Sequence, residues 1–273
     1  MTRIAVLADI HGNLPAFEAA IQHVSQQKAD RIILAGDIVN GAPDSKDCWS
    51  LALSLGCPIL RGNQERYVAH FGTALAPPLW SMEQFAPVQW TVDQLSEQDR
   101  LRMEQLPFDM RLPEAPDLYF VHATEQDDHQ TVVSHTPEQA LNEMFPTAQE
   151  RYILRAHNHI GGVRVWKRGF IVTCGSAGLP LDGHPTAQYL LLDRERNGWK
   201  IQHQSVPYPL DAAINRFRDT GYLSAVGPMG KLFFREIVTA SHQIVPFLRL
   251  YAQWSKQEGD LSLSQAVERF LSL

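Results

Sequence analysis

Seven side chains of the kinds that bind metal ions follow short apolar runs in the first 160 residues. They are Asp9, His11, Asp37, Asn63, His122, His157 and His159. Residues two apart on an extended segment point to the same side, so the first two and the last two can each direct a pair of ligands to one place. Loops at the carboxyl ends of strands gather at one crevice in open α/β sheets. The spacing therefore predicts one cluster of oxygen and imidazole ligands without cysteine.

Taken singly, these residues have other interpretations. An aspartate after a strand often begins a helix, as Asp9 or Asp37 would. Asn63 follows Gly62 and suits a turn. A lone histidine such as His122 is more often a hydrogen-bonded core residue than a ligand. Only the ordered occurrence of all seven at strand ends favours a metal site.

The apolar runs predict the elements that position these residues. In the first third, strands at 4–7, 31–35 and 58–60 alternate with helices at 14–27 and 49–55, which favours a parallel sheet with right-handed crossovers. Later strands are predicted at 117–121, 152–156, 163–166, 170–173, 188–193 and 199–203. Short turns at 167–169 and 196–198 suit hairpins, so the later sheet is expected to be partly antiparallel.

Helical patterns occupy the rest of the chain. Two helices are predicted within 80–106, a short one at 139–145, and three more at 210–217, 234–254 and 261–271. We expect a single domain over 1–273, with a core at about 1–205, a helical cap at about 80–106 and a helical extension at about 208–273. The cap pattern is equally that of a packed structural helix.

Composition limits the kind of protein and partner. A net charge of −6 in 273 residues argues against a stable complex with nucleic acid. A small anionic substrate is compatible, since bound cations invert the local field. Three separated cysteines, the absence of a signal-peptide pattern and the lack of a membrane-length apolar stretch predict a cytoplasmic protein without a membrane partner.

The ordered motifs resemble those of the calcineurin-like metallophosphoesterases, from residue 4 to about 193. The matching segments are Asp9-Ile-His-Gly-Asn13, Gly36-Asp37, Gly62-Asn-Gln-Glu65, Val121-His122 and His157-Asn-His159, followed by the glycine-rich segment 174–183. Any one of these motifs is weak alone, but the set in this order is specific.

The resemblance implies an α/β fold, a four-layer α/β/β/α sandwich with mixed sheets and two metal ions between them. One ion would take Asp9, His11 and His159, and the other Asn63, His122 and His157, with Asp37 bridging. Such a pair activates a metal-bound hydroxide as the nucleophile for phosphoester or phosphoanhydride hydrolysis. Manganese is the ion we expect, and iron or zinc also suits these ligands.

Gln64 stands where the family usually has a histidine, and Asp37, Asn63, Gln64 and His122 are the predicted catalytic residues. A glutamine amide donates a hydrogen bond but delivers no proton at neutral pH. Either the substrate has a leaving group that needs little protonation, or catalysis is weakened. A third possibility is that His129 or His184 supplies the proton, although each also reads as a surface histidine.

Four residues are predicted to bind substrate, namely Asn13, Arg61, Gly175 and Ser176. The glycines at 175–178 would offer backbone amides to a phosphate, or they would only form a tight turn. Asn13 and Glu65 would otherwise orient ligands, and Asn40 would form a turn. Arg155 is a second candidate for contact with phosphate.

Three functions remain open from sequence. The first is hydrolysis of small phosphate compounds, with nucleotide anhydrides favoured over alkyl monoesters. The second is a phosphodiesterase acting on nucleotide diesters, and the third is a non-catalytic metal-binding module. The tail aromatics Phe233, Phe234, Phe247, Tyr251 and Trp254 would form a partner surface in that third case, or pack a core or a homodimer.

Overall fold

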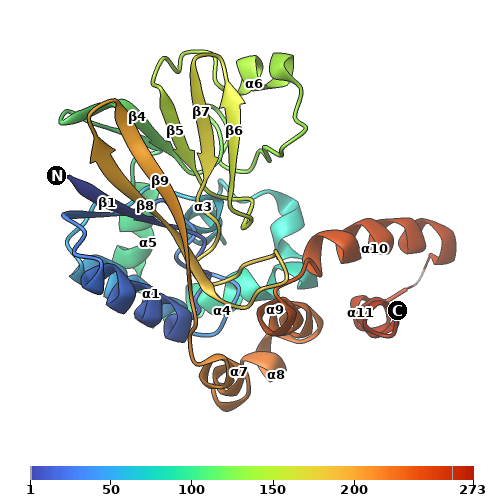
Figure 1. Cartoon of the computed structure of the whole chain (residues 1–273). Coiled ribbons are helices and arrows are strands. Elements are labelled where there is room, and N and C mark those ends of the chain that lie inside the picture. The colour runs from blue at the N-terminus through green and yellow to red at the C-terminus, as the bar shows by residue number, and fades with distance from the viewer. Residues whose placement is uncertain (1, 260) are drawn as a thin grey trace.

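The computed structural model describes residues 2–259 and 261–273, and two mixed β-sheets form its centre (Figure 1). The first sheet has the order β2-β1-β8-β9 and the second the order β3-β4-β5-β7-β6. In the first sheet the strands are β1 (Arg3–Leu7), β2 (Arg31–Leu34), β8 (Ala187–Glu195) and β9 (Gly198–Val206). In the second they are β3 (Asp109–Leu112), β4 (Ala115–Val121), β5 (Tyr152–Arg155), β6 (Gly162–Trp166) and β7 (Gly169–Thr173).

Strand alternation sorts the apolar side chains into separate layers. In β1, Ala5 and Leu7 face the helices, whereas Ile4 and Val6 face the space between the sheets. In β4, Phe120 faces that same space and its neighbours face the other way, toward α6. The result is three apolar cores that separate four layers, which confirms the predicted α/β/β/α sandwich.

The helices cover the outer faces of the sheets and extend beyond the first one (Figure 1). Asn13 begins α1 by accepting a hydrogen bond from the amide of Ala16, with a proline in the first turn. The helices before the tail are α1 (Leu14–Gln26), α2 (Ser45–Ser54), α3 (Asn63–His70), α4 (Ala86–Gln94), α5 (Glu97–Glu104) and α6 (Glu138–Met144). Two short 3₁₀ turns, η1 (Pro78–Ser81) and η2 (Glu83–Phe85), precede α4.

The helical tail packs into the same core as α1 and the first sheet. Its helices are α7 (Leu210–Asp219), α8 (Tyr222–Val226), α9 (Pro228–Thr239), α10 (Ile244–Glu258) and α11 (Leu263–Leu271). Phe247 and Trp254 are buried in this core, and the ring of Phe247 lies 5.5 Å from that of Tyr251. The aromatic side chains of the tail are therefore mainly internal packing rather than an open partner surface.

The structure differs from the sequence prediction in several places. Residues 58–60 make only a bridge between Leu34 and Ile59, because Pro58 has no amide proton for a ladder. The edge strand β3 and the helices α3 and α8 were not predicted. The single helix predicted at 234–254 is interrupted after Thr239, where Ala240 adopts a left-handed φ of 49°.

Among the helices of the described residues, none is long and apolar enough to cross a membrane. The two helices predicted within 80–106 are present as α4 and α5. They pack beside α2 and α3, with the indole of Trp49 donating to the carboxylate of Asp99 at 3.1 Å.

Candidate metal centre

The backbone is unusual at the residues predicted to bind metal. Five of the seven adopt left-handed φ angles of 52–69°, namely Asp9, His11, Asp37, His157 and His159. Such angles are rare for residues with a Cβ atom and cost about 1–3 kcal/mol each. Hydrogen bonds between the loops maintain them, since the amides of Ile10 and His11 both donate to the carbonyl of Asp37, at 2.7 and 3.0 Å. Strain concentrated on these residues is typical of a functional site.

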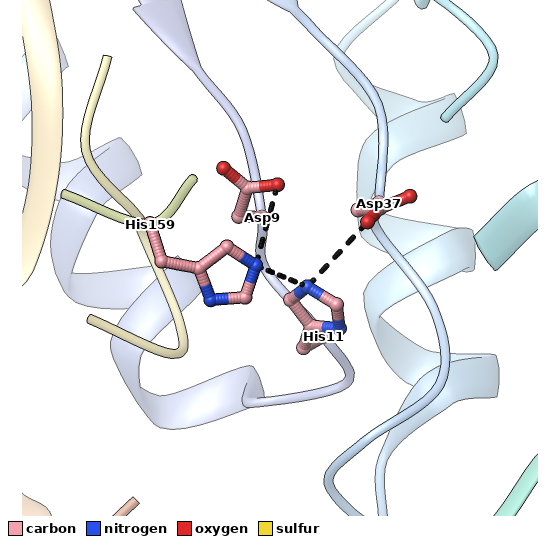
Figure 2. A group of neighbouring side chains, drawn as sticks. All are labelled: Asp9, His11, Asp37 and His159. Atoms are coloured by element: carbon pink, nitrogen blue, oxygen red, sulfur yellow. Dashed lines mark hydrogen bonds and ion pairs between the residues drawn. The ribbon is translucent and has the colours of Figure 1, made fainter. Parts of the chain in front are cut away.

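One group of side chains gathers between the loops that follow β1, β2 and β5 (Figure 2). It consists of Asp9, His11, Asp37 and His159, all buried. The Nε2 atom of His11 lies 3.0 Å from Nε2 of His159 and 3.6 Å from Oδ2 of Asp37. Nε2 of His159 lies 3.7 Å from Oδ1 of Asp9. Four ligand atoms therefore surround one point.

A second group shares Asp37 with the first. It adds His122 from the end of β4 and His157 from the loop after β5. Nε2 of His122 lies 3.4 Å from Oδ2 of Asp37. Oδ1 of Asn63, the first residue of α3, lies 3.2 Å from this nitrogen and 3.1 Å from Nδ1 of His157. Each group draws ligand atoms from both sheets.

The hydrogen bonds of the imidazoles identify which nitrogen is free. Nδ1 of His11 lies 2.8 Å from the carbonyl of Asn40, and Nδ1 of His159 lies 2.7 Å from that of Leu179. Because carbonyls only accept, these Nδ1 atoms carry the protons, and the two Nε2 lone pairs face each other. His122 is held in the same way by Ala35.

The two facing Nε2 atoms indicate whether a cation fits between His11 and His159. The 3.0 Å contact between Nε2 of His11 and Nε2 of His159 is unfavourable unless a positive charge lies between them. The amide of Asn63 lies beside the second group, with its Oδ1 3.1 Å from Nδ1 of His157 and 3.2 Å from Nε2 of His122. Imidazole and carboxylate atoms arranged in this way suit divalent ions of the manganese, iron and zinc type. The residues present fit a metal centre.

Burial and the neighbouring carboxylates determine the charge states of the candidate ligands. Burial lowers the pKa values of His11, His157 and His159, that of His157 to about 3, so these rings are neutral, as metal ligands must be. Burial also raises the pKa of Asp9 well above its usual value.

Asp37 and His122 behave as a pair. Burial opposes both charges, but the attraction between the two holds the pKa of Asp37 below its usual range and raises that of His122 to about 10. Without metal, a proton on His122 therefore supplies the positive charge that Asp37 requires.

A family model of the calcineurin-like phosphoesterases matches residues 2–161, which include all seven candidate ligands. The chain belongs to this family. Members are hydrolases that act on phosphate esters and use divalent metals, which confirms the enzyme class predicted from sequence.

Relatives of this phosphoesterase come from bacteria and archaea. The uncharacterized protein MJ0912 of Methanocaldococcus jannaschii is 22% identical over 231 residues, which cover 78% of this chain and 90% of that protein. A crystal structure of a metallophosphoesterase from Sphaerobacter thermophilus aligns with a TM-score of 0.68 and 21% identity, over 87% of this chain and 98% of that one. Hypothetical protein PH1004 from Pyrococcus horikoshii OT3 aligns with a TM-score of 0.71 and 19% identity, over 85% and 98%. These structures share the fold.

Glu65 holds in place the loop that carries Asp37, the carboxylate shared by the two groups of ligands. Its side chain is fully buried and accepts the amides of Asp37, Ile38 and Gly62 at 2.8, 2.7 and 2.9 Å. Burial and the charge of Asp37 raise the pKa of Glu65 to about 7 despite these bonds. The residue fixes the position of Asp37 relative to the start of α3, as its predicted orienting role requires.

Gln64 lies between the two groups. Its backbone amide donates to Oδ1 of Asp37 at 2.8 Å, and its side-chain oxygen accepts from Nδ2 of Asn40 at 2.6 Å. Asn40 also accepts a bond from His11 through its carbonyl, so its part is larger than the predicted turn. The replacement of histidine by glutamine thus leaves a hydrogen-bonded link between α3 and a loop that supports His11.

The structure separates the two histidines considered as proton donors. The ring of His129 lies 5.1 Å from that of His157, beside the second group. His184 is 77% exposed and contacts Asp182 instead. Only His129 borders the site.

Two of the predicted substrate-binding residues are fully engaged within the protein. Nδ2 of Asn13 donates to the carbonyl of Gly178 at 2.7 Å, while its Oδ1 caps α1. Oγ of Ser176 donates to the carbonyl of Asp9 at 2.7 Å and accepts from the amide of Leu179 at 2.7 Å. Both side chains are buried and have this structural role, and their contact with substrate stays a prediction.

The glycine-rich segment also supports the loop that carries Asp9. The amides of Ala177 and Gly178 donate to the carbonyls of Ala8 and Asp9 at 2.8 and 3.1 Å. A Cβ atom on Gly178 would lie 1.8 Å from the carbonyl oxygen of Ile10, so only glycine allows this approach. Gly175 has a φ of 83° and forms the turn before it.

The two arginines considered for phosphate contact also contact other parts of the protein. Arg61 lies against α5, with Nη1 3.6 Å from the carboxylate of Glu104. Arg155 is fully buried and donates to the carbonyls of Ala123 and Gln130 at 2.8 and 3.2 Å. Burial lowers its pKa to about 10, although Asp9 opposes the shift. Arg155 ties together the loops after β4 and β5, a role that the sequence did not reveal.

Proposed function

We propose that this chain hydrolyses phosphoester or phosphoanhydride bonds of small substrates at a centre of two divalent ions. The observation that carries the proposal is the position of Asp37. Its Oδ2 atom lies 3.6 Å from Nε2 of His11 and 3.4 Å from Nε2 of His122, so one carboxylate belongs to both groups. A shared carboxylate between two sets of imidazoles is the arrangement required to bridge two cations.

The residues divide between the two ions as the groups suggest. Asp9, His11 and His159 would hold one ion, Asn63, His122 and His157 the other, and Asp37 both. When bound, such a pair supplies Lewis acidity toward phosphate oxygens and lowers the pKa of water. The carbonyls of Asn40, Leu179 and Ala35 keep three imidazoles in the tautomer that presents Nε2. We infer manganese as the ion, which the nitrogen and oxygen ligands support.

The presence of Gln64 indicates which kind of leaving group the substrate has. Its amide cannot protonate an alkoxide, whereas a departing phosphate has a pKa of only about 6 and needs no proton. This supports nucleotide anhydrides such as dinucleoside polyphosphates as substrates. The three cysteines are free, which supports a reducing, cytoplasmic setting for such a reaction.

The test compares four substrates on manganese-loaded protein whose metal content is measured on the same sample. They are diadenosine tetraphosphate, bis-p-nitrophenyl phosphate, p-nitrophenyl phosphate and phosphoserine. We expect the anhydride to have the highest kcat/KM. Preference for phosphoserine would overturn the leaving-group argument, and metal-replete protein inert on all four would overturn the proposed activity.

A Gln64→His variant separates the remaining alternatives. It restores a group that can donate a proton, so turnover of phosphoserine is expected to rise by about 10²-fold or more, with little change for the anhydride. Unchanged turnover of phosphoserine would show that another residue already acts as the acid. His129 is then the first residue to test.

A further inference from the structure

A row of aromatic rings leads away from the second group of ligands. It begins at His157 and continues through His129, Tyr67, Trp80 and Phe85. Successive ring centroids are 5.1, 6.4, 4.9 and 5.9 Å apart. These spacings are those of rings in contact. The row joins the candidate metal centre to the segment that precedes α4.

The rings of the row differ in exposure, and His129, beside the metal centre, is the most exposed of them. Trp80 is 7% exposed and packs its ring edge-to-face on Tyr67, and Phe85 beyond it is partly exposed. His129 is exposed, and Tyr67 is partly exposed. The most accessible ring, that of His129, therefore lies next to His157, one of the candidate ligands.

An ion pair holds the loop of His129 in place. Nε and Nη2 of Arg66 donate to the two carboxylate oxygens of Asp128 at 2.6 and 2.7 Å. Arg66 also lies 4.9 Å above the ring of Tyr67. Because Asp128 directly precedes His129, this bidentate pair fixes the loop against α3. The exposed imidazole is thus positioned before any ligand arrives, which lowers the entropy cost of binding.

An exposed ring held beside a phosphate site suits a planar partner. Every nucleobase offers a π-face, and stacking on an aromatic side chain is tolerant of base identity. An alkyl or sugar phosphate offers no such face. Two carboxylates of this loop lie beside the row: that of Asp128 is paired with Arg66, and that of Asp127 accepts the backbone amide of His129 at 2.7 Å.

We propose that His129, backed by Tyr67, forms a stacking subsite for the base of a nucleotide whose phosphate lies at the metal centre. This inference rests on the proposed function and names its substrate class. It predicts that the protein binds a nucleotide more tightly than a phosphate compound of equal charge that lacks an aromatic ring.

Calorimetric titration of manganese-loaded protein with adenosine 5′-monophosphate and with methyl phosphate tests the subsite. Wild-type protein should bind the nucleotide more tightly. His129→Ala should weaken nucleotide binding by about 5- to 150-fold, the range for loss of one stacked base, while methyl phosphate binding changes little. His129→Phe should retain the nucleotide preference. His184→Ala, which removes an exposed histidine remote from the row, is the matched control.

Several results would overturn the subsite. These are equal affinity of the wild-type protein for both ligands, no detectable nucleotide binding, unchanged nucleotide affinity in His129→Ala, or loss of the preference in His129→Phe. Failure of the proposed function is a separate outcome, because it appears as absence of hydrolysis in the four-substrate comparison whether or not the nucleotide preference exists.

Discussion

Replacement of Glu65 by alanine is the sharpest test of how the metal centre is supported. The change leaves three buried amides, those of Asp37, Ile38 and Gly62, without the acceptor that now lies 2.7–2.9 Å away. A hydrogen bond to a charged group contributes about 1.5–3 kcal/mol, but relief of the buried charge offsets part of the sum. We therefore expect the free energy of unfolding to fall by about 3–5 kcal/mol.

The same change should weaken metal binding. Asp37 adopts its left-handed φ of 55° in the loop that Glu65 holds, so without the carboxylate the loop can relax. Glu65→Gln keeps the shape but turns an amide donor toward backbone donors, and we expect an intermediate loss. Glu18→Ala, an exposed glutamate on α1, is the matched control.

Urea unfolding of metal-free protein, followed by circular dichroism, measures the first effect. The ions retained after gel filtration in manganese measure the second. If Glu65→Ala unfolds within about 1 kcal/mol of the wild type and retains the same metal content, the carboxylate does not hold the loop and the reasoning is wrong.

Three further predictions concern metal, pH and backbone contact. Removal of the metal with a chelator should abolish hydrolysis, and addition of manganese should restore it. The free energy of unfolding should fall by about 3 kcal/mol relative to protein in a solution that contains the ion at a hundred times its Kd. An unchanged urea midpoint after chelation would contradict this prediction. Burial raises the pKa of Glu236 from 4.5 to about 7, so the folded state binds the extra proton and stability should fall as pH rises through this interval, by about 3 kcal/mol in all. Glu236→Gln should remove this pH dependence of unfolding in metal-free protein; a variant with the wild-type pH profile would refute it. Gly178→Ala should reduce metal retention because the added Cβ atom would displace the carbonyl of Ile10. Gly162→Ala is the control, since no atom lies within 4 Å of the added carbon, and it should retain metal as the wild type does. Equal metal retention in the two variants would show that the close approach of Gly178 to Ile10 does not support the metal centre.

The order of the ligand residues along the chain was predictable because each follows an apolar segment of the core. Local pattern suffices there, since the carboxyl end of a strand fixes where the next residue lies. The supporting residues were less accessible. The contacts of Ser176 with Asp9 and of Arg155 with Gln130 join segments 167 and 25 residues apart, and no periodicity encodes them.

The errors in the fold have local physical causes. The helix predicted at 234–254 is two helices because the carboxylate of Glu236 accepts the amides of Gln243 and Ile244 and so begins α10. Pro246, in the first turn of α10, was the available signal for this break. The strand β3 was missed because it is short, and Asp109 and Arg111 interrupt its apolar pattern.

Because each group of ligands draws on both sheets, the ions bind only after the two halves of the sandwich have docked. His11 and His159 are separated by 148 residues, and closing so long a loop is a slow step in folding. Ions added after this step stabilise the native state but not the transition state that precedes it. They should therefore slow unfolding while leaving the folding rate nearly unchanged, so that the metal increases the kinetic stability of the folded chain.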